Sequence, residues 1–220
     1  MAYSGMPERS HKHIYFDLET GGLNPRKHPI IQLAAIAVDD QLQPIEAFEA
    51  KILFDERKAD RNSLRKNHYH PGLWAKEALE PEEVAKSFAD FLRRHATVPM
   101  LSKDGSPYFV AQLVAHNATF DGAFIHTWYE RLHTFLPARY HVLCTLQRAM
   151  WYFQEHLGEP PPSDFKLATL CQYFGVPFHA ATAHEALADV SATVALSQAM
   201  RRRSAAPDHS LPIRTQTQAA

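Results

Sequence analysis

The stretch HIYFDLETGG, residues 13–22, decides the fold. Its apolar side chains at positions 14, 16 and 18 alternate with Tyr15, Asp17 and Glu19, which is the period of two that a β-strand requires. Gly21 and Gly22 then end the strand. Because Asp17 and Glu19 are two residues apart, we expect their carboxylates to lie together on the face opposite the apolar one.

Two neighbouring carboxylates repel each other, and most such pairs on a solvated strand are ordinary surface acids. This pair belongs to a strand that reads as central, because another apolar run follows its glycine turn. Acids at such a place cost stability unless they are paired or bind a cation. Asp17 and Glu19 are therefore candidates for a metal site.

The segments that follow predict an antiparallel meander. The apolar run 30–38 is typical of a buried second strand, and the acidic pair 39–40 is typical of the turn after it. A third strand is expected from alternating apolar residues, namely Phe48, Ile52 and Phe54. Residues 55–80 are charged and lack clear periodicity, so we expect a long connection there.

Strands and helices alternate in the rest of the chain. A helix is expected from Pro81, with acids in its first turn and a buried stripe of Val84, Phe88, Phe91 and Leu92. A loop at 103–107, a fourth strand over 109–115 and a helix follow, and the helix carries Phe124, Trp128, Leu132 and Phe135 at helical spacing. The remaining expected elements are a short strand near 141–143, a helix through 146–153, a loop at 160–163, a helix over 167–174 ended by Gly175 and Pro177, and a last helix over about 186–203. A meander followed by such alternation predicts an α/β domain with a mixed sheet flanked by helices.

Length and composition are those of a globular protein. The chain has 220 residues, of which 45% are hydrophobic and 21% charged, enough for one sizeable core. We expect one domain over 13–203, with disordered ends at 1–12 and 204–220. No run approaches the roughly 18 apolar residues of a membrane helix, and the polar start lacks a signal-peptide stretch. These features predict a cytoplasmic protein without a membrane partner.

The charge balance gives no sign of a strongly basic surface. Lys and Arg number 23 against 24 Asp and Glu, a formal charge of -1, so any contact with nucleic acid must be local. A group of basic residues in the long connection could follow a phosphate backbone, although such runs are more often solvated surface. The group comprises Arg57, Lys58, Arg61, Arg65 and Lys66.

Cysteine and histidine give little support for a zinc protein. Cys144 and Cys171 each lie in an apolar stretch, which favours small buried side chains over a disulfide or a metal pair. A zinc site built on paired histidines is a further alternative, but cysteines or acids at ligand spacing are lacking. The pairs in question are His11 with His13 and His68 with His70.

Three more residues are candidates for the metal site or for proton transfer. Asp121 follows the fourth strand, where α/β folds place ligands, although the dipole also favours an acid in a first helical turn. His184 and Asp189 are five residues apart, which on a continuous helix leaves them roughly 140° apart. A shared site therefore requires His184 to precede the last helix or to lie in its first turn. Among 14 histidines, a lone one carries little weight.

The order and context of these residues resemble the DEDDh exonuclease superfamily. Residues 16–21, FDLETG, resemble its first motif, and residues 115–121, AHNATFD, resemble the second. His184 with Asp189 matches the third, which is a histidine, four residues and an aspartate. The superfamily includes the proofreading epsilon subunit of bacterial DNA polymerase III, ribonuclease T and oligoribonuclease. The resemblance covers roughly residues 13–196 and implies a ribonuclease H-like fold.

The resemblance also implies an activity. It implies a 3′→5′ exonuclease that acts on DNA, preferentially single-stranded or frayed, and releases nucleoside 5′-monophosphates. Asp17, Glu19, Asp121 and Asp189 would hold two Mg²⁺ or Mn²⁺ ions, which prefer carboxylate and water ligands. His184 would take the proton from the attacking water, a role that suits a side chain whose unperturbed pKa is about 6.5.

Substrate contacts are implied in the same way. The backbone at Thr20 and Gly21 would approach the terminal sugar, Leu23 would pack on the last base, and Asn117 and Phe120 would lie near the scissile end. For Phe120 a core position is an equal alternative. The family often has Thr-Thr-Gly after the glutamate, where this chain has Thr, Gly and Gly at 20–22.

Two other functions stay open at this point. One is a 3′→5′ exoribonuclease that trims RNA ends or short oligoribonucleotides, because nothing in the sequence decides whether a 2′-hydroxyl is accepted. The other is a non-catalytic accessory module of a replication or repair assembly, tethered through residues 204–220. The presence of all four acids and His184 argues against the second. A partner polymerase and the oligomeric state are likewise left open.

Overall fold

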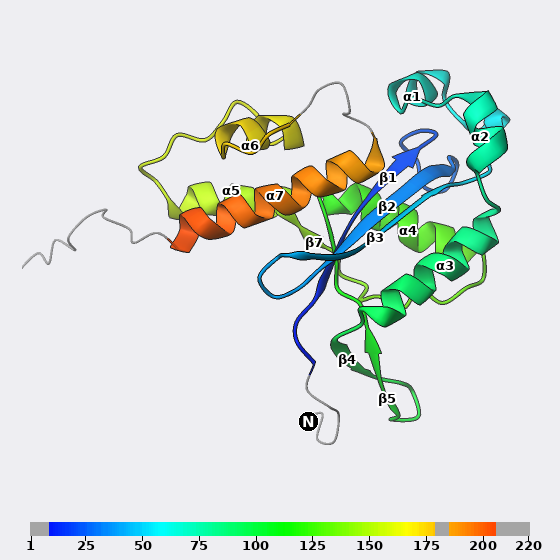
Figure 1. Cartoon of the computed structure of the whole chain (residues 1–220), viewed down its shortest axis with the longest axis horizontal. Helices are drawn as coiled ribbons and strands as arrows, with labels where there is room; N and C mark the ends of the chain where they lie inside the picture. The colour runs from blue at the N-terminus through cyan, green and yellow to red at the C-terminus, as the bar shows by residue number, and fades with distance from the viewer. Residues whose placement is uncertain (1–8, 179–184, 206–220) are drawn as a thin grey trace, which may run out of the picture.

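The computed structural model describes residues 9–178 and 185–205, and its centre is a five-stranded sheet in the order β3-β2-β1-β6-β7 (Figure 1). β1 (His13–Thr20) lies in the middle. β2 (Ile30–Val38) and β3 (Pro44–Lys51) form the antiparallel meander, whereas β6 (Leu113–Ala115) and β7 (Leu143–Cys144) join in parallel. This mixed sheet confirms the predicted α/β class.

One face of the sheet packs against α3 (Pro81–Arg94) and α4 (Ala118–Arg131). The apolar side chains of β1 enter this core, as their alternation predicts. They meet Val84, Phe88, Phe91 and Leu92 of α3 and Phe124, Ile125, Trp128 and Tyr129 of α4. Phe48 of β3 packs between the rings of Phe88 and Phe91, at centroid distances of 5.3 and 5.7 Å. Four aromatic and aliphatic residues at helical spacing were therefore sufficient to predict the buried face of α3.

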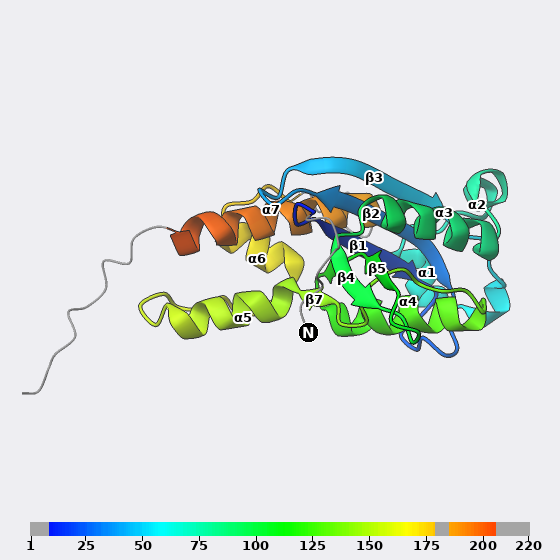
Figure 2. The same ribbon diagram turned by 90° about the horizontal axis from the view of Figure 1, so that it is seen from below.

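The opposite face of the sheet lies under α7 (Ala186–Ala205). Val190 and Val194 of this helix pack against Tyr15 of β1, so α7 covers the same face of β1 that carries the two acids. The outer side of α7 packs against α5 (Thr145–Glu155) and α6 (Leu167–Tyr173) (Figure 2). The position of α7 therefore brings its first turn to the acidic end of β1.

The expected connection at 55–80 is more structured than its charge pattern indicates. It contains the 3-10 turn η1 (Glu56–Lys58), α1 (Arg61–Lys66) and α2 (Pro71–Glu77). The capping groups are local: Asp55 and Asp60 accept hydrogen bonds from the first amides of η1 and α1, and a proline opens α2. Helices of six and seven residues are too short to produce a hydrophobic period.

The third strand is shorter than predicted. β3 ends at Lys51. The amide of Ile52 still donates to the Ile31 carbonyl of β2 at 2.8 Å, but Ile52 also pairs with Leu79, and the amide of Leu53 donates to the Leu79 carbonyl. Phe54 therefore leaves the sheet, and its ring packs on Tyr69 at 5.1 Å. The apolar alternation in the sequence continues past the end of β3 because Phe54 packs against a neighbouring loop and not against the sheet.

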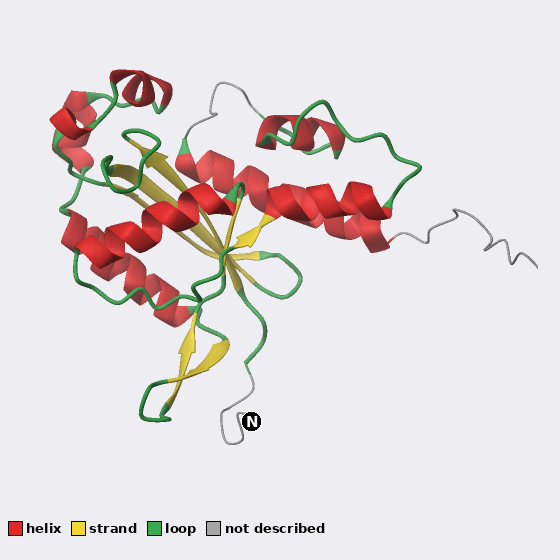
Figure 3. Ribbon diagram, turned by 180° about the vertical axis from the view of Figure 1, so that it is seen from behind, coloured by secondary structure: helices red, strands yellow, loops and turns green. Residues whose placement is uncertain are grey.

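The predicted fourth strand is two strands. β5 (Pro107–Val110) pairs with β4 (Val98–Leu101), which was not predicted, and β6 pairs with β1. The β4-β5 hairpin projects away from the main sheet, as both Figure 1 and Figure 3 show. Its strands of four residues alternate too briefly to be recognised without a partner.

The helix α4 is also shorter than the predicted apolar stripe. It ends at Arg131, and His133 adopts a left-handed backbone conformation just beyond it. Phe135 is consequently 59% exposed rather than part of the buried stripe. The ends predicted as disordered, 1–12 and 204–220, lie largely outside the described residues; of those described, Arg9 stacks on Phe109 at 3.9 Å and α7 extends to residue 205.

No helix within the described ranges is long and apolar enough to pass through a membrane. Both cysteines are free thiols, Cys144 half-buried and Cys171 buried.

Candidate active site

Three carboxylates meet at the end of the central strand. Asp17 and Glu19 of β1 and Asp189 of α7 each offer an oxygen, and these oxygens lie within 4.8 Å of one another. Glu19 is buried, and the other two side chains are half-buried. In the part of the chain that the structure describes, this is the one group of three or more acids, histidines or cysteines with metal-ligand spacing.

Asp121 joins the same cavity from the other side of the sheet. It lies in the first turn of α4, is 3% exposed, and lines a cavity of about 690 Å³ together with the three clustered acids. The turn before α4 is tight, because Asn117 adopts a left-handed conformation between β6 and the helix. The structure therefore brings all four acids together, with Asp121 at the edge of the cluster.

The pKa values of three of these acids, Asp17, Glu19 and Asp121, are raised. Burial, with the charge of Asp189, raises the pKa of Asp17 to about 7. Burial, with the charges of Asp17 and Asp189, raises the pKa of Glu19 to about 9 against the opposing effect of Lys66. Burial and the charge of Asp17 also raise the pKa of Asp121. A group of acids that cannot ionise together at neutral pH without a counter-charge is a fitting site for cations.

The donor set decides which cations fit. Only carboxylates contribute to the cluster, and hard cations such as Mg²⁺ and Mn²⁺ prefer oxygen ligands, whereas zinc sites usually include histidine or cysteine. The predicted histidine, His184, lies outside the described residues. The histidine pairs considered for zinc are not part of any such cluster among the residues that the structure describes.

Four of the five predicted substrate residues line the cavity, and Gly21 does not. The lining four are Thr20, Leu23, Asn117 and Phe120. Leu23 lines the cavity and is 81% exposed, so its side chain is accessible to a ligand there. Phe120 packs on Phe124 with the ring centroids 4.9 Å apart, and it also lines the cavity.

Gly21 supports the cavity from behind. Its amide donates to the carbonyl of Pro29 at 2.8 Å, and its carbonyl accepts from the amide of Asp60 at 2.6 Å. A Cβ atom at this position would lie 2.8 Å from the Cβ of Ala59, which is closer than real Cβ contacts. The glycine therefore allows the loop after β3 to pack against the end of β1.

The basic residues of the long connection separate into two groups. Lys66 lines the cavity with Ser63 and Asn67, and the side-chain amide of Asn67 donates to the carbonyl of Thr20 at 2.9 Å. Arg57, in contrast, is exposed and pairs with Asp55 at 2.9 Å. The other three, Lys58, Arg61 and Arg65, do not line the cavity. The helix α1 is therefore a wall of the cavity that sequence periodicity did not reveal.

The segment around α6 forms a second wall of the cavity, which was also not predicted from the sequence. Phe165, Lys166 and Leu167 line the cavity there. His116 ties this wall to the acids, because its Nε2 lies 3.0 Å from the carbonyl of Phe165 and its Nδ1 lies 2.9 Å from the Thr145 hydroxyl. His116 stands next to Asn117 in the second motif, and that position was the only signal for it.

Comparison with known proteins is consistent with this geometry. A family model described as Exonuclease matches residues 14–101 and 108–197. The DNA polymerase III PolC-type proteins of Staphylococcus haemolyticus (strain JCSC1435) and Staphylococcus aureus (strain bovine RF122 / ET3-1) are each 33% identical over 135 residues. The match covers 61% of this chain but only 8% of the length of these relatives.

Solved structures of exonuclease I share the fold. One of these structures, which suggests how exonuclease I achieves processivity, superposes with a TM-score of 0.69 at 17% identity over 87% of this chain. Another, Escherichia coli exonuclease I in complex with a dT13 oligonucleotide, superposes with a TM-score of 0.70 at 17% identity over 88% of this chain. This chain spans 41% of each of those chains. At such identity the likeness establishes the ribonuclease H-like fold.

Proposed function

The chain belongs to the DEDDh 3′→5′ exonuclease superfamily, and from this premise we propose that it removes nucleoside 5′-monophosphates one at a time from the 3′ end of DNA. Single-stranded or frayed ends are the proposed substrate. The observation that carries the proposal is the cluster of Asp17, Glu19 and Asp189 within 4.8 Å, at the edge of a cavity of about 690 Å³, a volume within the range of ligand sites.

Two divalent cations, Mg²⁺ or Mn²⁺, are the proposed cofactors. Asp17, Glu19, Asp121 and Asp189 would hold them, and the raised pKa values of the first three support a site that is completed by positive charge. When bound, such ions polarise the phosphoryl group and stabilise charge on the attacking and leaving oxygens. The acids themselves would hold their ligand oxygens in fixed places, because β1 and α7 are packed against each other.

The other residues would bind and orient the strand end. We assign Leu23 to packing on the terminal base, the backbone at Thr20 and Gly21 to the terminal sugar, and Asn117 and Phe120 to the scissile end. Contact between a base and an apolar or aromatic side chain tolerates any base, as a non-selective exonuclease requires. His184 is proposed as the group that accepts the proton of the attacking water.

Substitution of Leu23 tests the strand-binding assignment. Because the side chain is 81% exposed, Leu23→Ala is expected to leave the melting temperature unchanged. Loss of base packing, worth roughly 1–3 kcal/mol, should raise KM for a single-stranded oligonucleotide about tenfold with little change in kcat. Leu157→Ala, an 86% exposed leucine outside the cavity, serves as the matched control. Equal KM values for the two variants would contradict the assignment.

The raised pKa values predict a pH-dependent stability. In the unfolded chain Glu19 ionises near its ordinary pKa, 4.5, whereas in the folded protein its pKa is about 9. The folded state therefore binds more protons between these values, and stability falls as pH rises. In EDTA, the melting temperature should fall by several degrees between pH 6.5 and 9. Asp17, whose pKa is about 7, contributes to this loss of stability mainly below pH 7.

Adding metal and substituting Glu19 distinguish the titration of these acids from that of other groups that affect the melting temperature. Mg²⁺ or Mn²⁺ is expected to raise the melting temperature more at pH 9 than at pH 6.5, because cations bind the ionised carboxylates. Glu19→Gln should flatten the slope in EDTA and remove most of the metal effect. Differential scanning fluorimetry measures both. A slope that is the same in the natural chain and in Glu19→Gln would show that these acids are not the cause.

The function itself is tested with matched 3′-labelled DNA and RNA oligonucleotides. We expect stepwise release of mononucleotides with Mg²⁺ or Mn²⁺ and none in EDTA. Single-stranded DNA and a duplex with a mismatched 3′ end should be cleaved faster than a fully paired duplex. A higher rate on RNA would identify an exoribonuclease instead. No cleavage of any substrate by folded protein would favour the accessory-module alternative.

A further inference from the structure

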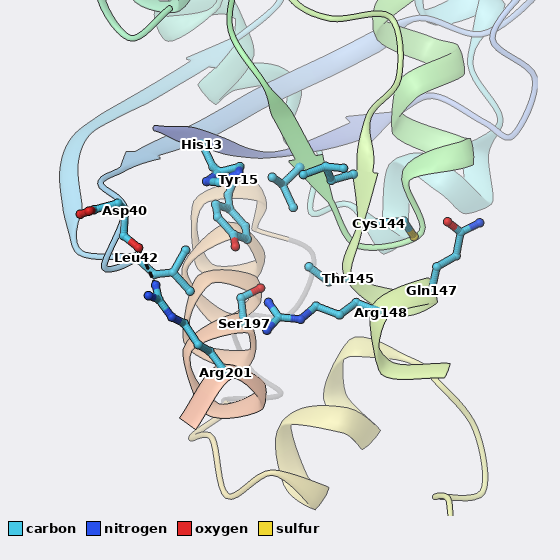
Figure 4. A pocket seen from close by; sticks show the side chains of 12 residues that line it. His13, Tyr15, Asp40, Leu42, Cys144, Thr145, Gln147, Arg148, Ser197 and Arg201 are labelled. Atoms are coloured by element: carbon cyan, nitrogen blue, oxygen red, sulfur yellow. Dashed lines mark hydrogen bonds between the residues drawn. The ribbon is translucent and has the colours of Figure 1, made fainter. Parts of the chain in front are cut away.

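A second cavity, of about 440 Å³, lies at the start of β1 (Figure 4). His13 and Tyr15 of β1 face it, as do Arg148 of α5 and Ser197 and Arg201 of α7. His13 and Tyr15 lie on the same face of β1 as the catalytic acids, and the four residue steps from His13 to Asp17 span roughly 13 Å of strand. The two cavities share no lining residue, so the second is a separate place on the molecule.

Polar atoms in this cavity are incompletely paired. Among the residues that the structure describes, the buried Nδ1 of His13 has no hydrogen-bond partner. Ser197 is fully buried, and its Oγ lies near the Tyr15 hydroxyl without a hydrogen bond of normal geometry. Buried polar groups are normally hydrogen-bonded, and an unpaired one costs stability. Figure 4 shows the Ser197 and Tyr15 hydroxyls directed into the space between β1, α5 and α7, where a ligand atom could pair with them.

The charge in the cavity is positive. The guanidinium of Arg148 reaches into it (Figure 4) and has no ion pair or hydrogen bond to any residue in the ranges 9–178 and 185–205. Arg201 donates to the main-chain carbonyl of Asp40, whose carboxylate points away from the cavity. Burial lowers the pKa of His13, and the charges of His11 and Arg148 lower it further. Among the described residues that line the cavity, no carboxylate faces the two arginines, and such a pair of guanidinium groups forms a site for an anion.

The rest of the lining is apolar. Leu42, Val114 and Leu143 contribute to it, and Leu143 is 47% exposed at the rim. The volume lies within the range of small-molecule sites, which are mostly apolar with a few placed polar groups. A ligand with a charged head and an uncharged body therefore suits this cavity better than a simple ion.

We propose that this cavity binds the phosphate group of a phosphate monoester, with a nucleoside 5′-monophosphate as the ligand. A phosphate monoester carries about 1.5 to 2 negative charges at pH 7, which two arginines balance, whereas a carboxylate carries one. Its three free oxygens can accept hydrogen bonds from both guanidinium groups and from the Ser197 and Tyr15 hydroxyls. The choice of a nucleoside as the body rests on the proposed function, which would produce such molecules nearby; the choice of the phosphate head does not.

The test is a calorimetric titration of thymidine 5′-monophosphate into Asp17→Asn protein in EDTA, so that neither cleavage nor bound metal contributes. We expect one ligand per chain, at least tenfold weaker binding by the additional variant Arg148→Gln, and a similar loss for Arg201→Gln. Arg202→Gln is the matched control, since this exposed arginine lies next to Arg201 but does not line the cavity. Binding that Arg148→Gln leaves unchanged would mean that the nucleotide occupies the catalytic cavity, and would overturn the proposal.

Four further ligands identify the recognised group. Inorganic phosphate should bind more weakly than the nucleotide, and thymidine without phosphate should not bind at millimolar concentration. A 5′-phosphorylated oligonucleotide that binds more tightly than the free nucleotide would support the phosphate monoester and place it on a strand end. Acetate binding as tightly as phosphate, or no binding of any phosphate by folded protein, would overturn the proposal. Because the titrations require no cleavage, their failure and that of the proposed exonuclease are distinguishable.

Discussion

Replacement of Asp17 by Asn is expected to reduce the rate of mononucleotide release on the order of a thousandfold, the scale on which loss of a charge-stabilising group at a reacting centre is felt. The substitution removes one charged ligand from the cluster with Glu19 and Asp189. It preserves shape, and the raised pKa of Asp17, about 7, means that the neutral form is already tolerated in the fold. Activity should therefore be lost without loss of structure.

Rates and melting temperatures together check this result. In EDTA at pH 8, Asp17→Asn should melt at the same temperature as the natural chain or higher, because a carboxylate that is costly to ionise is gone. Mg²⁺ should stabilise the variant less than the natural chain. Asp90→Asn is the control, because Asp90 is an exposed acid on α3 that pairs with Arg93 and does not line the cavity. Activity within tenfold of the natural chain for Asp17→Asn would remove this carboxylate from the catalytic centre.

The sequence predicts well those elements whose own pattern of apolar residues shows which faces are buried. β1 alternates because one face meets α3 and α4, and β2 is apolar except for Gln32 because both of its faces are covered. The bounds of β1 and β2 and the start of α3 follow from these patterns and from the proline at position 81. Such elements can be predicted without knowing which distant segments they contact.

The parts that were mispredicted depend on contacts between distant residues. Phe54 leaves the sheet because Leu79 pairs with the end of β3 and Tyr69 covers the ring. The segment 109–115 is divided because its first half pairs with β4 and its second half with β1. The two halves of this segment have the same apolar character, and only their partner strands distinguish them.

The same division holds for the site. The positions of Asp17 and Glu19 on one face follow from a period of two, and Asp189 reaches them because α7 packs on that face. The cavity walls contributed by Lys66 and Phe165 could not be predicted, because α1 and the segment before α6 carry no pattern that points toward β1. Only the folded chain brings these segments to the acids.

His184→Ala is expected to reduce kcat by about 10² to 10⁴, the usual contribution of a positioned general base, with KM changed little. The residue lies outside the described ranges, and its assignment rests on the third motif of the superfamily. A base with an ordinary histidine pKa should give the natural chain a rate that rises with pH through about 6.5, and the variant should lose that rise. His141→Ala, an exposed histidine before β7, is the control and should keep both rate and profile. If His184→Ala retains the natural rate and the same pH profile, the attacking water does not give its proton to this histidine. The four acids would then have to act without it.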